Sequence, residues 1–241
     1  MGQEIRLLVH GASGRMGRAV LRLAGVDPRF RVVAAVSRSG TAPDDAVAAL
    51  ASAELAQAPA FDVAVDFSLP AGLQGLLDLC VQRGAALVSG TTGLDPGLRA
   101  RLAAAAEAVP VAWASNFSLG VVVLEDLLRR AAGALPWPVE IIETHHVHKL
   151  DAPSGTAISL AAAAAEVQGR TPPIESVREG EVVGTHRIRL RGVGEALELA
   201  HVASDRDIFA RGALETAARL AGRPARLWRL PELLFDGENV D

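Results

Sequence analysis

The first half of the chain alternates short apolar runs with stretches whose apolar residues recur at helical spacing. The runs are almost continuously apolar, which is typical of strands buried on both faces of a parallel sheet. They lie at residues 5–9, 31–36, 62–67, 86–89 and 111–114. Helical stretches separate most of them, whereas residues 41–58 indicate only a weak helix and a loop. The order predicts an α/β fold with a Rossmann-type, doubly wound parallel sheet.

The pattern changes after residue 117. A long helical stretch leads into a buried strand, an alanine-rich helix, an antiparallel strand pair and a final helix. These elements are expected at residues 119–132, 139–143, 154–168, 182–190, 196–202 and 209–220. Residues 169–181 carry glycine, prolines and charges, so we expect a mobile loop or linker there. This half predicts a smaller α+β domain.

Composition narrows the class of protein. In 241 residues there is no apolar run of about 18 residues, so no membrane span is expected. A net charge of −4 with no basic block argues against a nucleic-acid binder. We find no export signal at the N-terminus, and the single cysteine, Cys80, cannot form an internal disulfide. A cytoplasmic location is therefore expected.

A glycine-rich turn joins the first predicted strand to the first helix. Its sequence, GASGRMG at 11–17, places Gly11, Gly14 and Gly17 three residues apart, with Ser13 where the common fingerprint has glycine. Gly11 permits a tight turn, and the other glycines permit close approach of the backbone. The N–H groups at the helix start then face a pyrophosphate. The alternative is a tight turn without a ligand.

The second predicted strand ends in Ser37, Arg38 and Ser39. An NAD-preferring site commonly has a carboxylate here to accept hydrogen bonds from the ribose hydroxyls. Here no carboxylate repels a 2′-phosphate, and Arg38 could pair with one. The sequence therefore predicts that NADPH is preferred or accepted. The alternative is a solvated surface arginine.

Small and polar residues also follow the later strands. Gly90 allows a cofactor to approach the backbone, Thr91 and Thr92 offer hydroxyls, and Asn116 can both donate to and accept from a carboxamide. Any one of them is compatible with ordinary turn chemistry. Together they mark the edge at which open α/β sheets bind ligands.

The loop after residues 139–143 holds three of the six histidines, His145, His146 and His148, and the only lysine, Lys149. Three interpretations compete: a metal site, a loop whose histidines form only structural hydrogen bonds, and a site for an anionic substrate with acid catalysis. No complete ligand set is evident for a metal, and lysine opposes a cation. Histidine suits proton donation and Lys149 suits carboxylates. Ser154 is the candidate N-cap of the following helix, whose first residues, Gly155 and Thr156, can bind an anion.

These motifs together resemble the dihydrodipicolinate reductase (4-hydroxy-tetrahydrodipicolinate reductase) family of the diaminopimelate route to lysine. The matching stretches are GASGRMG at 11–17, DFS at 66–68, SGTTG at 89–93, SNFSLGV at 115–121 and ETHHVHKLDAPSGTA at 143–157. The resemblance implies hydride transfer from NADPH or NADH to a cyclic, imine-containing dicarboxylate, without a metal. The products implied are tetrahydrodipicolinate and water.

The resemblance also implies roles for single residues. His145 matches the proton donor, Lys149 the second catalytic cation and His146 a substrate contact, while Gly155 and Thr156 match the pair that holds a substrate carboxylate. Arg38 matches the residue that meets the 2′-phosphate, and Ser37 stands where many members carry an acidic residue. The implied nucleotide contacts are Gly11, Ala12, Ser13, Gly14, Arg15, Met16, Ser37, Arg38, Gly90, Thr91, Thr92, Ala114, Ser115, Asn116 and Phe117.

The implied organisation is a dinucleotide-binding domain over 1–116 and a substrate-binding and oligomerisation domain over 117–222, assembled as a homotetramer. The tail, 223–241, is expected to dock back onto the first domain. The lean segment at 41–60 suggests a reduced adenine-side loop. Rival functions are another two-domain reductase, such as an aspartate or homoserine dehydrogenase, and a non-catalytic nucleotide sensor.

Overall fold

The computed structural model describes residues 4–40 and 48–235, and its contacts divide them into two units. Unit 1 combines the chain up to Phe117 with the segment from Phe209 onward, and unit 2 is Ser118–Ile208. Each unit has its own sheet, so each is described by itself. Among the described residues, no helix is both long and apolar enough to cross a membrane.

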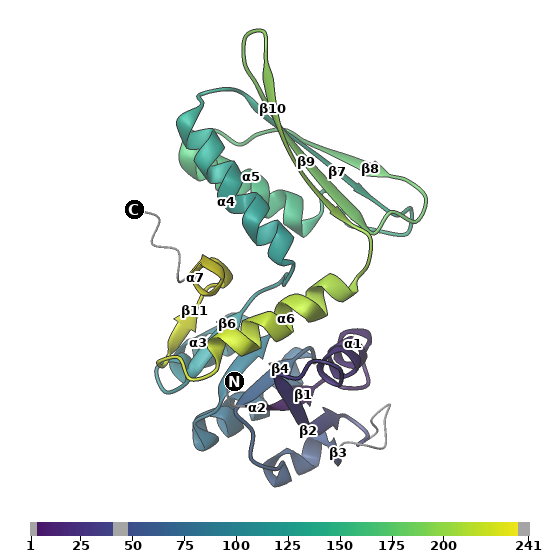
Figure 1. Cartoon of the computed structure of the whole chain (residues 1–241), viewed down its shortest axis with the longest axis vertical. Coiled ribbons are helices and arrows are strands. Elements are labelled where there is room, and N and C mark those ends of the chain that lie inside the picture. Colours follow the sequence, from purple (N-terminus) through teal and green to yellow (C-terminus); the bar gives the residue numbers. More distant parts are fainter. Residues whose placement is uncertain (1–3, 41–47, 236–241) are drawn as a thin grey trace. The chain divides into compact units, whose positions relative to one another are not determined.

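Unit 1 is built on a seven-stranded sheet of order β11-β6-β5-β4-β1-β2-β3, and every neighbouring pair is parallel (Figure 1). The order reverses direction at β1, as in a doubly wound fold. This confirms the predicted fold class. Its elements are β1 (Ile5–His10), α1 (Arg15–Ala24), β2 (Phe30–Ser37), β3 (Ala48–Ala51), η1 (Ser52–Gln57), β4 (Val63–Asp66), α2 (Pro70–Arg83), β5 (Ala86–Ser89), α3 (Pro96–Ala106), β6 (Pro110–Trp113), α6 (Asp207–Leu220), β11 (Arg226–Trp228) and α7 (Leu230–Phe235).

The strands of unit 1 are buried on both faces, which is why they are apolar at successive positions. Alternate side chains such as Leu8 and Leu87 pack into one core cluster with Leu76 of α2 and Leu102 of α3. Their sequence neighbours face the other side and are equally buried, and α1 packs there against β1 and β2. The sheet is thus fixed by helices on both sides.

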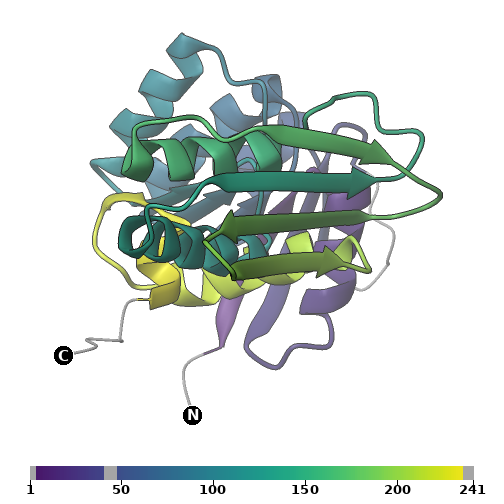
Figure 2. The same cartoon turned by 90° about the horizontal axis from the view of Figure 1, so that it is seen from above.

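Unit 2 is built on a four-stranded mixed sheet of order β10-β9-β7-β8. Helices α4 and α5 lie side by side against one face of this sheet (Figures 1 and 2). Along β7 the inward side chains are buried and the outward ones only half-buried, the period expected of a sheet covered on one face. The elements are α4 (Leu119–Ala134), β7 (Val139–His145), α5 (Gly155–Gln168), β8 (Ile174–Arg178), β9 (Gly184–Arg191) and β10 (Ala196–Ala203).

Two local predictions were wrong. The segment 169–181, expected to be a mobile loop, contains β8, which pairs in parallel with β7 through Ile141↔Ile174 to His145↔Arg178. A short strand without clear alternation gains its regularity from that pairing and shows little of it in its sequence. Within the expected weak helix and loop at 41–58, Ala48–Ala51 form edge strand β3 and Ser52–Gln57 a 3₁₀ helix; residues 41–47 lie outside the described residues.

The C-terminal segment belongs to unit 1. Strand β11 pairs in parallel with β6, and Arg29 beside β2 forms an ion pair of 2.7 Å with Glu215 of α6. Helix α6 was assigned to the second domain from sequence, whereas the structure's division falls after Ile208. The helix carries a buried small-residue face, and sequence alone does not say which sheet that face meets.

Candidate functional site

The glycine turn between β1 and α1 requires glycine for steric reasons. Gly11 has φ +80°, and a Cβ there would lie 2.5 Å from the carbonyl oxygen of Phe67. A Cβ on Gly17 would lie 2.2 Å from the carbonyl oxygen of Gly11, because α1 packs directly onto the turn. Gly14 precedes the first turn of α1 in extended conformation. The turn therefore presents the N–H groups of a helix start, which suits a pyrophosphate.

Backbone hydrogen bonds bring the strand-end loops of unit 1 together at the carboxyl edge of the sheet. The N–H groups of Gly11 and Ala12 donate to the Val36 carbonyl, and that of Gly90 donates to the Asp66 carbonyl at 2.8 Å. The residues predicted to contact the nucleotide lie around this edge and differ in their solvent exposure. The exposed ones are Ser13, Gly14, Arg15, Arg38, Thr92 and Ser115; Gly11, Met16, Gly90, Ala114 and Asn116 are half-buried; Ala12, Ser37, Thr91 and Phe117 are buried.

A buried polar network at this edge was missed by the sequence analysis. Register aligns His10, Asp66, Ser89 and Trp113 as one row across β1, β4, β5 and β6. The fully buried carboxylate of Asp66 accepts from His10 Nδ1 at 2.8 Å and from the hydroxyls of Ser89 and Thr91 at 2.7 Å each. The hydroxyl of Thr91 was predicted to meet a cofactor, but it donates its hydrogen bond to Asp66 inside the protein.

Asp66 stays ionised although it is buried. Burial by itself raises the pKa of this carboxyl, but hydrogen bonding and the charge of His10, with donors from Ser68 and Thr91, hold the pKa of Asp66 below its usual range. One signal of this network was available, because histidine and aspartate each end a continuous apolar strand. The strand register that brings these two residues together cannot be read from the sequence.

Aromatic packing supplies an additional reason for Gly90. A Cβ there would lie 2.2 Å from Phe67 Cε1, so the ring of Phe67 occupies the space beside it. The Phe67 ring in turn meets Phe117 edge to face, with centroids 5.9 Å apart. Two of the predicted nucleotide loops are thus packed through one aromatic pair.

In unit 2, strand β7 ends at His145, and its alternation places Glu143 and His145 on the same, helix-facing side. The His145 Nδ1 atom hydrogen bonds to the carboxylate of Glu143, which is fully buried. The other carboxylate oxygen accepts from Arg178 of β8 at 2.9 Å and from the backbone N–H of Ser154 at 3.2 Å. This carboxylate therefore joins β7, β8 and the start of α5.

The charges around His145 oppose one another. Burial alone raises the pKa of Glu143, but hydrogen bonds from Arg178, Ser176 and His145 lower it to about 2. For His145, burial lowers the pKa, Glu143 raises it, and the positive charges of Lys149 and Arg178 lower it further. The balance holds the pKa of His145 below its usual range.

Lys149 follows on the loop after β7. Its Nζ lies 2.8 Å from both carboxylate oxygens of Asp151, and its side chain is 22% exposed. The hydrogen bond from Lys149 lowers the pKa of Asp151, so the pair is charged. Within the described ranges, no group of three or more histidine, cysteine, aspartate or glutamate residues could hold a metal ion.

The three loop histidines have separate surroundings. His145 is buried, whereas His146 is half-buried and its Nε2 lies 3.0 Å from Arg206. His148 is exposed, and its Nε2 lies 4.0 Å from a carboxylate oxygen of Glu181. The predicted cluster therefore provides a single buried imidazole.

Helix α5 begins immediately after this loop. The Ser154 hydroxyl accepts from Ala157 N at 3.2 Å, which confirms Ser154 as the N-cap. Gly155 is exposed and Thr156 is half-buried in the first turn. The positive end of the helix dipole and this turn can bind a carboxylate.

Two further histidines of this sheet were missed, of which His186 is buried and His201 is half-buried. His186 of β9 and His201 of β10 are directly paired across the strands, and the His186 ring meets that of His145 with centroids 5.3 Å apart. His186 Nε2 contacts the Ser154 hydroxyl at 3.2 Å, and His201 Nε2 contacts the Ser118 hydroxyl at 3.3 Å. Burial, followed by the neighbouring imidazoles His145 and His201, lowers the pKa of His186 to about 4.

The sequence contained a signal for this pair. The glycines at 192 and 194 lie between two strand-like runs and indicate a hairpin, and the observed register of that hairpin pairs residue 186 with residue 201. His186 also shares the inward face with Ile188 and Leu190. Combining register with alternation would have placed both histidines under the helices.

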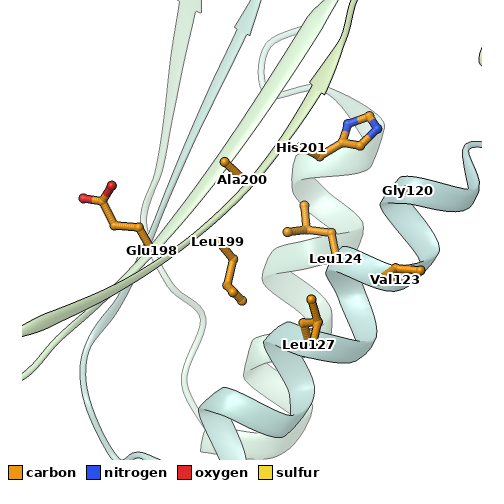
Figure 3. A pocket seen from close by; sticks show the side chains of 8 residues that line it. All are labelled: Gly120, Val123, Leu124, Leu127, Glu198, Leu199, Ala200 and His201. Carbon is orange, nitrogen blue, oxygen red and sulfur yellow. The ribbon is translucent and has the colours of Figure 1, made fainter.

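A separate pocket in unit 2 lies between α4 and β10 and has a volume of about 440 Å³ (Figure 3). It is mostly apolar, and none of the predicted catalytic or substrate residues line it. Figure 3 shows His201 beside the first turn of α4 and the Glu198 side chain pointing away from that helix. Its lining residues are Gly120, Val123, Leu124, Leu127, Glu198, Leu199, Ala200 and His201.

The parallel sheet and its glycine turn place the chain in the class of Rossmann-type, dinucleotide-binding proteins. Family models then narrow the class. Residues 5–117 match "Dihydrodipicolinate reductase, N-terminus" and residues 120–234 match "Dihydrodipicolinate reductase, C-terminus". The chain belongs to the dihydrodipicolinate reductase family, which confirms the resemblance seen in the motifs.

Individual relatives agree with this assignment. The chain is 55% identical to the 4-hydroxy-tetrahydrodipicolinate reductase of Xanthomonas campestris pv. campestris (strain B100), over 96% of this chain and 98% of that protein. It is 52% identical to the protein of that name from Xylella fastidiosa (strain 9a5c), over 98% and 100%. A solved structure, dipicolinate-bound dihydrodipicolinate reductase from Paenisporosarcina sp. TG-14, has a TM-score of 0.84 at 25% identity, covering 94% of this chain and 98% of that chain.

The buried network at the carboxyl edge predicts that Asp66 is essential for the stability of unit 1. Asp66→Asn should lower the free energy of unfolding by about 3–5 kcal/mol, because it leaves buried donors without their anion. The matched control is Asp62→Asn, since Asp62 lies just before the same strand and pairs with Arg6 in a half-exposed setting. That change should cost about 1 kcal/mol or less. Urea unfolding at pH 7 measures both, and equal losses would contradict the special role of Asp66.

Proposed function

We propose that the protein is the NAD(P)H-dependent reductase that converts 4-hydroxy-tetrahydrodipicolinate to tetrahydrodipicolinate. Loss of water from the 4-hydroxy substrate gives the dihydrodipicolinate ring, which then takes up a hydride and a proton. Family membership and the named relatives support this activity. The observation that carries it is a shared carboxylate: Glu143 accepts from both His145 and the N-cap residue of α5. One group thereby fixes a proton donor next to a site for a carboxylate.

The residues of unit 1 fit a nicotinamide dinucleotide. Glycine at residues 11 and 17 lets the turn pack tightly against Phe67 and against the start of α1, which places the N–H groups of that helix start at the turn. When bound, NADPH or NADH supplies the hydride. The chain binds the pyrophosphate at this turn and orients the nucleotide along the carboxyl edge, where Asn116 can meet the carboxamide.

The residues of unit 2 hold the dicarboxylate. The N–H groups of Gly155 and Thr156 bind one substrate carboxylate at the positive end of α5. Lys149 adds a compact positive charge, and a substrate carboxylate replaces Asp151 as its partner. His146 lies next to Arg206, and both side chains favour binding of an anionic substrate. Dipicolinate, a dicarboxylate, is bound in the solved relative from Paenisporosarcina sp. TG-14.

His145 supplies the proton. Each turnover consumes one hydride and one proton, so a group must deliver a proton while the ring receives the hydride. Protonated His145 donates from Nε2, since Nδ1 is engaged with Glu143. Its pKa is below the usual range in the free protein. The negative charge of a bound dicarboxylate raises the pKa of His145, so that His145 becomes protonated when the substrate is present.

The catalytic assignment predicts a loss of turnover without a loss of nucleotide binding. His145→Gln and Lys149→Ala should each lower kcat by about 10²- to 10⁴-fold, because proton transfer and charge neutralisation are removed. Steady-state assays with the enzymatically generated substrate measure kcat, and fluorescence titration measures nucleotide affinity, which should stay unchanged.

The control for this experiment is His148→Gln, which changes an exposed imidazole of the same loop. Its activity should match that of the original protein. A turnover in His145→Gln or Lys149→Ala equal to that of the control would refute their roles. A protein that turns over aspartate or homoserine but not the dipicolinate precursor would favour the rival dehydrogenases.

The nucleotide preference is assigned to Arg38. It is exposed directly after β2, where the 2′-phosphate of NADPH is expected. Arg38→Ala should raise the KM for NADPH by about tenfold, equivalent to one charge-assisted contact, and leave the KM for NADH nearly unchanged. Arg31→Ala, at the other end of the same strand, is the control. A KM for NADH far below that for NADPH in the original protein would overturn the preference.

We also propose a cytoplasmic homotetramer that assembles through the outward face of the sheet of unit 2. Val202 on edge strand β10 is 65% exposed there, and its neighbour Ala200 is also exposed. Val202→Glu should shift the mass measured by light scattering from four times 25.1 kDa toward smaller species, since a charge is costly where apolar Val202 and Ala200 would be buried. Val26→Glu, at an 81% exposed residue of unit 1, should leave the tetramer intact. A monomeric original protein would contradict the assembly.

A further inference from the structure

We propose that Glu143 and Arg178 are positioning residues that select Nε2 of His145 as the proton-donating atom and tie that imidazole to the Lys149 loop. This inference rests on the proposed function of His145. Neither residue would touch the substrate in this scheme, because Glu143 is fully buried beneath His145 and Arg178 reaches the site through other groups.

The hydrogen-bonding capacity of Glu143 decides the tautomer of His145. An ionised carboxylate only accepts hydrogen bonds. Glu143 is ionised at neutral pH, because its pKa is lowered to about 2. The Nδ1 atom of His145 must therefore carry a hydrogen in both the neutral and the protonated ring. Only Nε2 can then release a proton and take it up again.

The Nε2 edge of the His145 ring faces a glycine of the neighbouring strand. Gly184 of β9 is its neighbour, and a Cβ there would lie 3.1 Å from Nε2 and 3.3 Å from Cδ2 of His145. Gly184 has no left-handed backbone conformation that would by itself require glycine. The absence of a side chain at this residue keeps the proton-donating edge of the ring open.

Arg178 connects the imidazole to the loop that carries Lys149. It lies beside His145 in the β7–β8 register, and one of its nitrogens donates to Glu143 at 2.9 Å. The same guanidinium donates to the carbonyls of Lys149 at 3.3 Å and of Asp151 at 2.5 Å. Arginine can do this because its planar head offers five donors, whereas lysine offers three from a single atom.

The charges that face His145 come from several elements. Glu143 of β7 is the negative group; Lys149 of the loop and Arg178 of β8 are positive; His186 of β9 packs against the ring, with His201 of β10 behind it. Of these, only Glu143 raises the pKa of His145. Loss of its charge therefore moves the titration of His145 to lower pH.

Glu143→Gln tests the inference directly. The glutamine amide can donate to Nδ1, so the ring is free to adopt the other tautomer, as happens when a triad aspartate is replaced by asparagine in serine proteases. We expect kcat to fall by about 10²-fold or more with unchanged nucleotide affinity. The descending limb of kcat against pH, where His145 loses its proton, should move to lower pH. The ¹⁵N chemical shifts of His145 should report Nδ1–H in the original protein and a changed tautomer in the variant.

The matched control is Glu140→Gln. Glu140 lies on the same strand, faces the opposite side and pairs with Arg191 in a half-exposed setting. It should leave both the kcat profile and the His145 shifts unchanged. Arg178→Lys should keep the charge near Glu143 but lose the links to the loop, which lowers kcat more than Glu140→Gln does. Gly184→Ala should lower kcat by about tenfold or more while His145 keeps its Nδ1–H tautomer.

The outcomes separate this inference from the proposed function. An original protein without reductase activity would refute the function, and the ¹⁵N spectrum of that same protein would still test the tautomer. An active protein in which His145 carries its hydrogen on Nε2 overturns the role of Glu143. So does a folded Glu143→Gln variant with the kcat and pH profile of the Glu140→Gln control. The spectrum of the original protein decides the tautomer even if Glu143→Gln does not fold.

Discussion

Unit 2 is organised around one fully buried negative charge. Removing a carboxylate from water costs several kcal/mol, and it is tolerated only where well-placed donors surround it. Glu143 has donors on three elements: His145 on its own strand, Arg178 and Ser176 on β8, and the backbone of Ser154 at the start of α5. Each donor is also part of the proposed site or holds it in place. The constraint that stabilises the charge thus fixes the relative positions of acid, loop and helix.

Unit 1 also contains a buried carboxylate surrounded by donors, at the edge of its parallel sheet. Asp66 lies at the end of a strand buried on both faces, and its donors come from β1, β5 and the loops that follow β4 and β5. The network sits beneath the loops that would meet the nucleotide. In both units a buried carboxylate joins strand ends, and exposed residues above it are left to contact ligands. This division explains why Thr91 serves the protein interior while Thr92 remains exposed.

The fold followed from local patterns to a large extent. Continuous apolar runs identified strands β1, β2, β4, β5 and β6 of the parallel sheet, and an antiparallel strand pair was predicted where the β9–β10 hairpin lies. Elements whose regularity comes from a neighbour were missed. Strand β8 lacks clear alternation and exists because β7 offers a parallel edge, and β3 is a four-residue edge strand. Helix α6 was found, but the sheet it packs with was not, because its small buried face fits more than one partner.

The candidate site divides in the same way. By itself the sequence determined which residues have unusual chemistry: glycines in a strand–helix turn, a lone lysine beside histidines, and a serine that caps a helix. These are decided by residue type and by spacing within one stretch of chain. Only the tertiary structure decided that His145 is the buried histidine of the three and that Glu143, Arg178 and His186 surround it. Those contacts join strands far apart in the chain, since His145 pairs with Arg178, 33 residues later, and Glu143 pairs with His186, 43 residues later. Their register depends on side-chain packing beneath two helices. A buried charge is stabilised by groups that are near in space and not in sequence. The sequence therefore identified His145 as the candidate proton donor but not the residues that hold it in position.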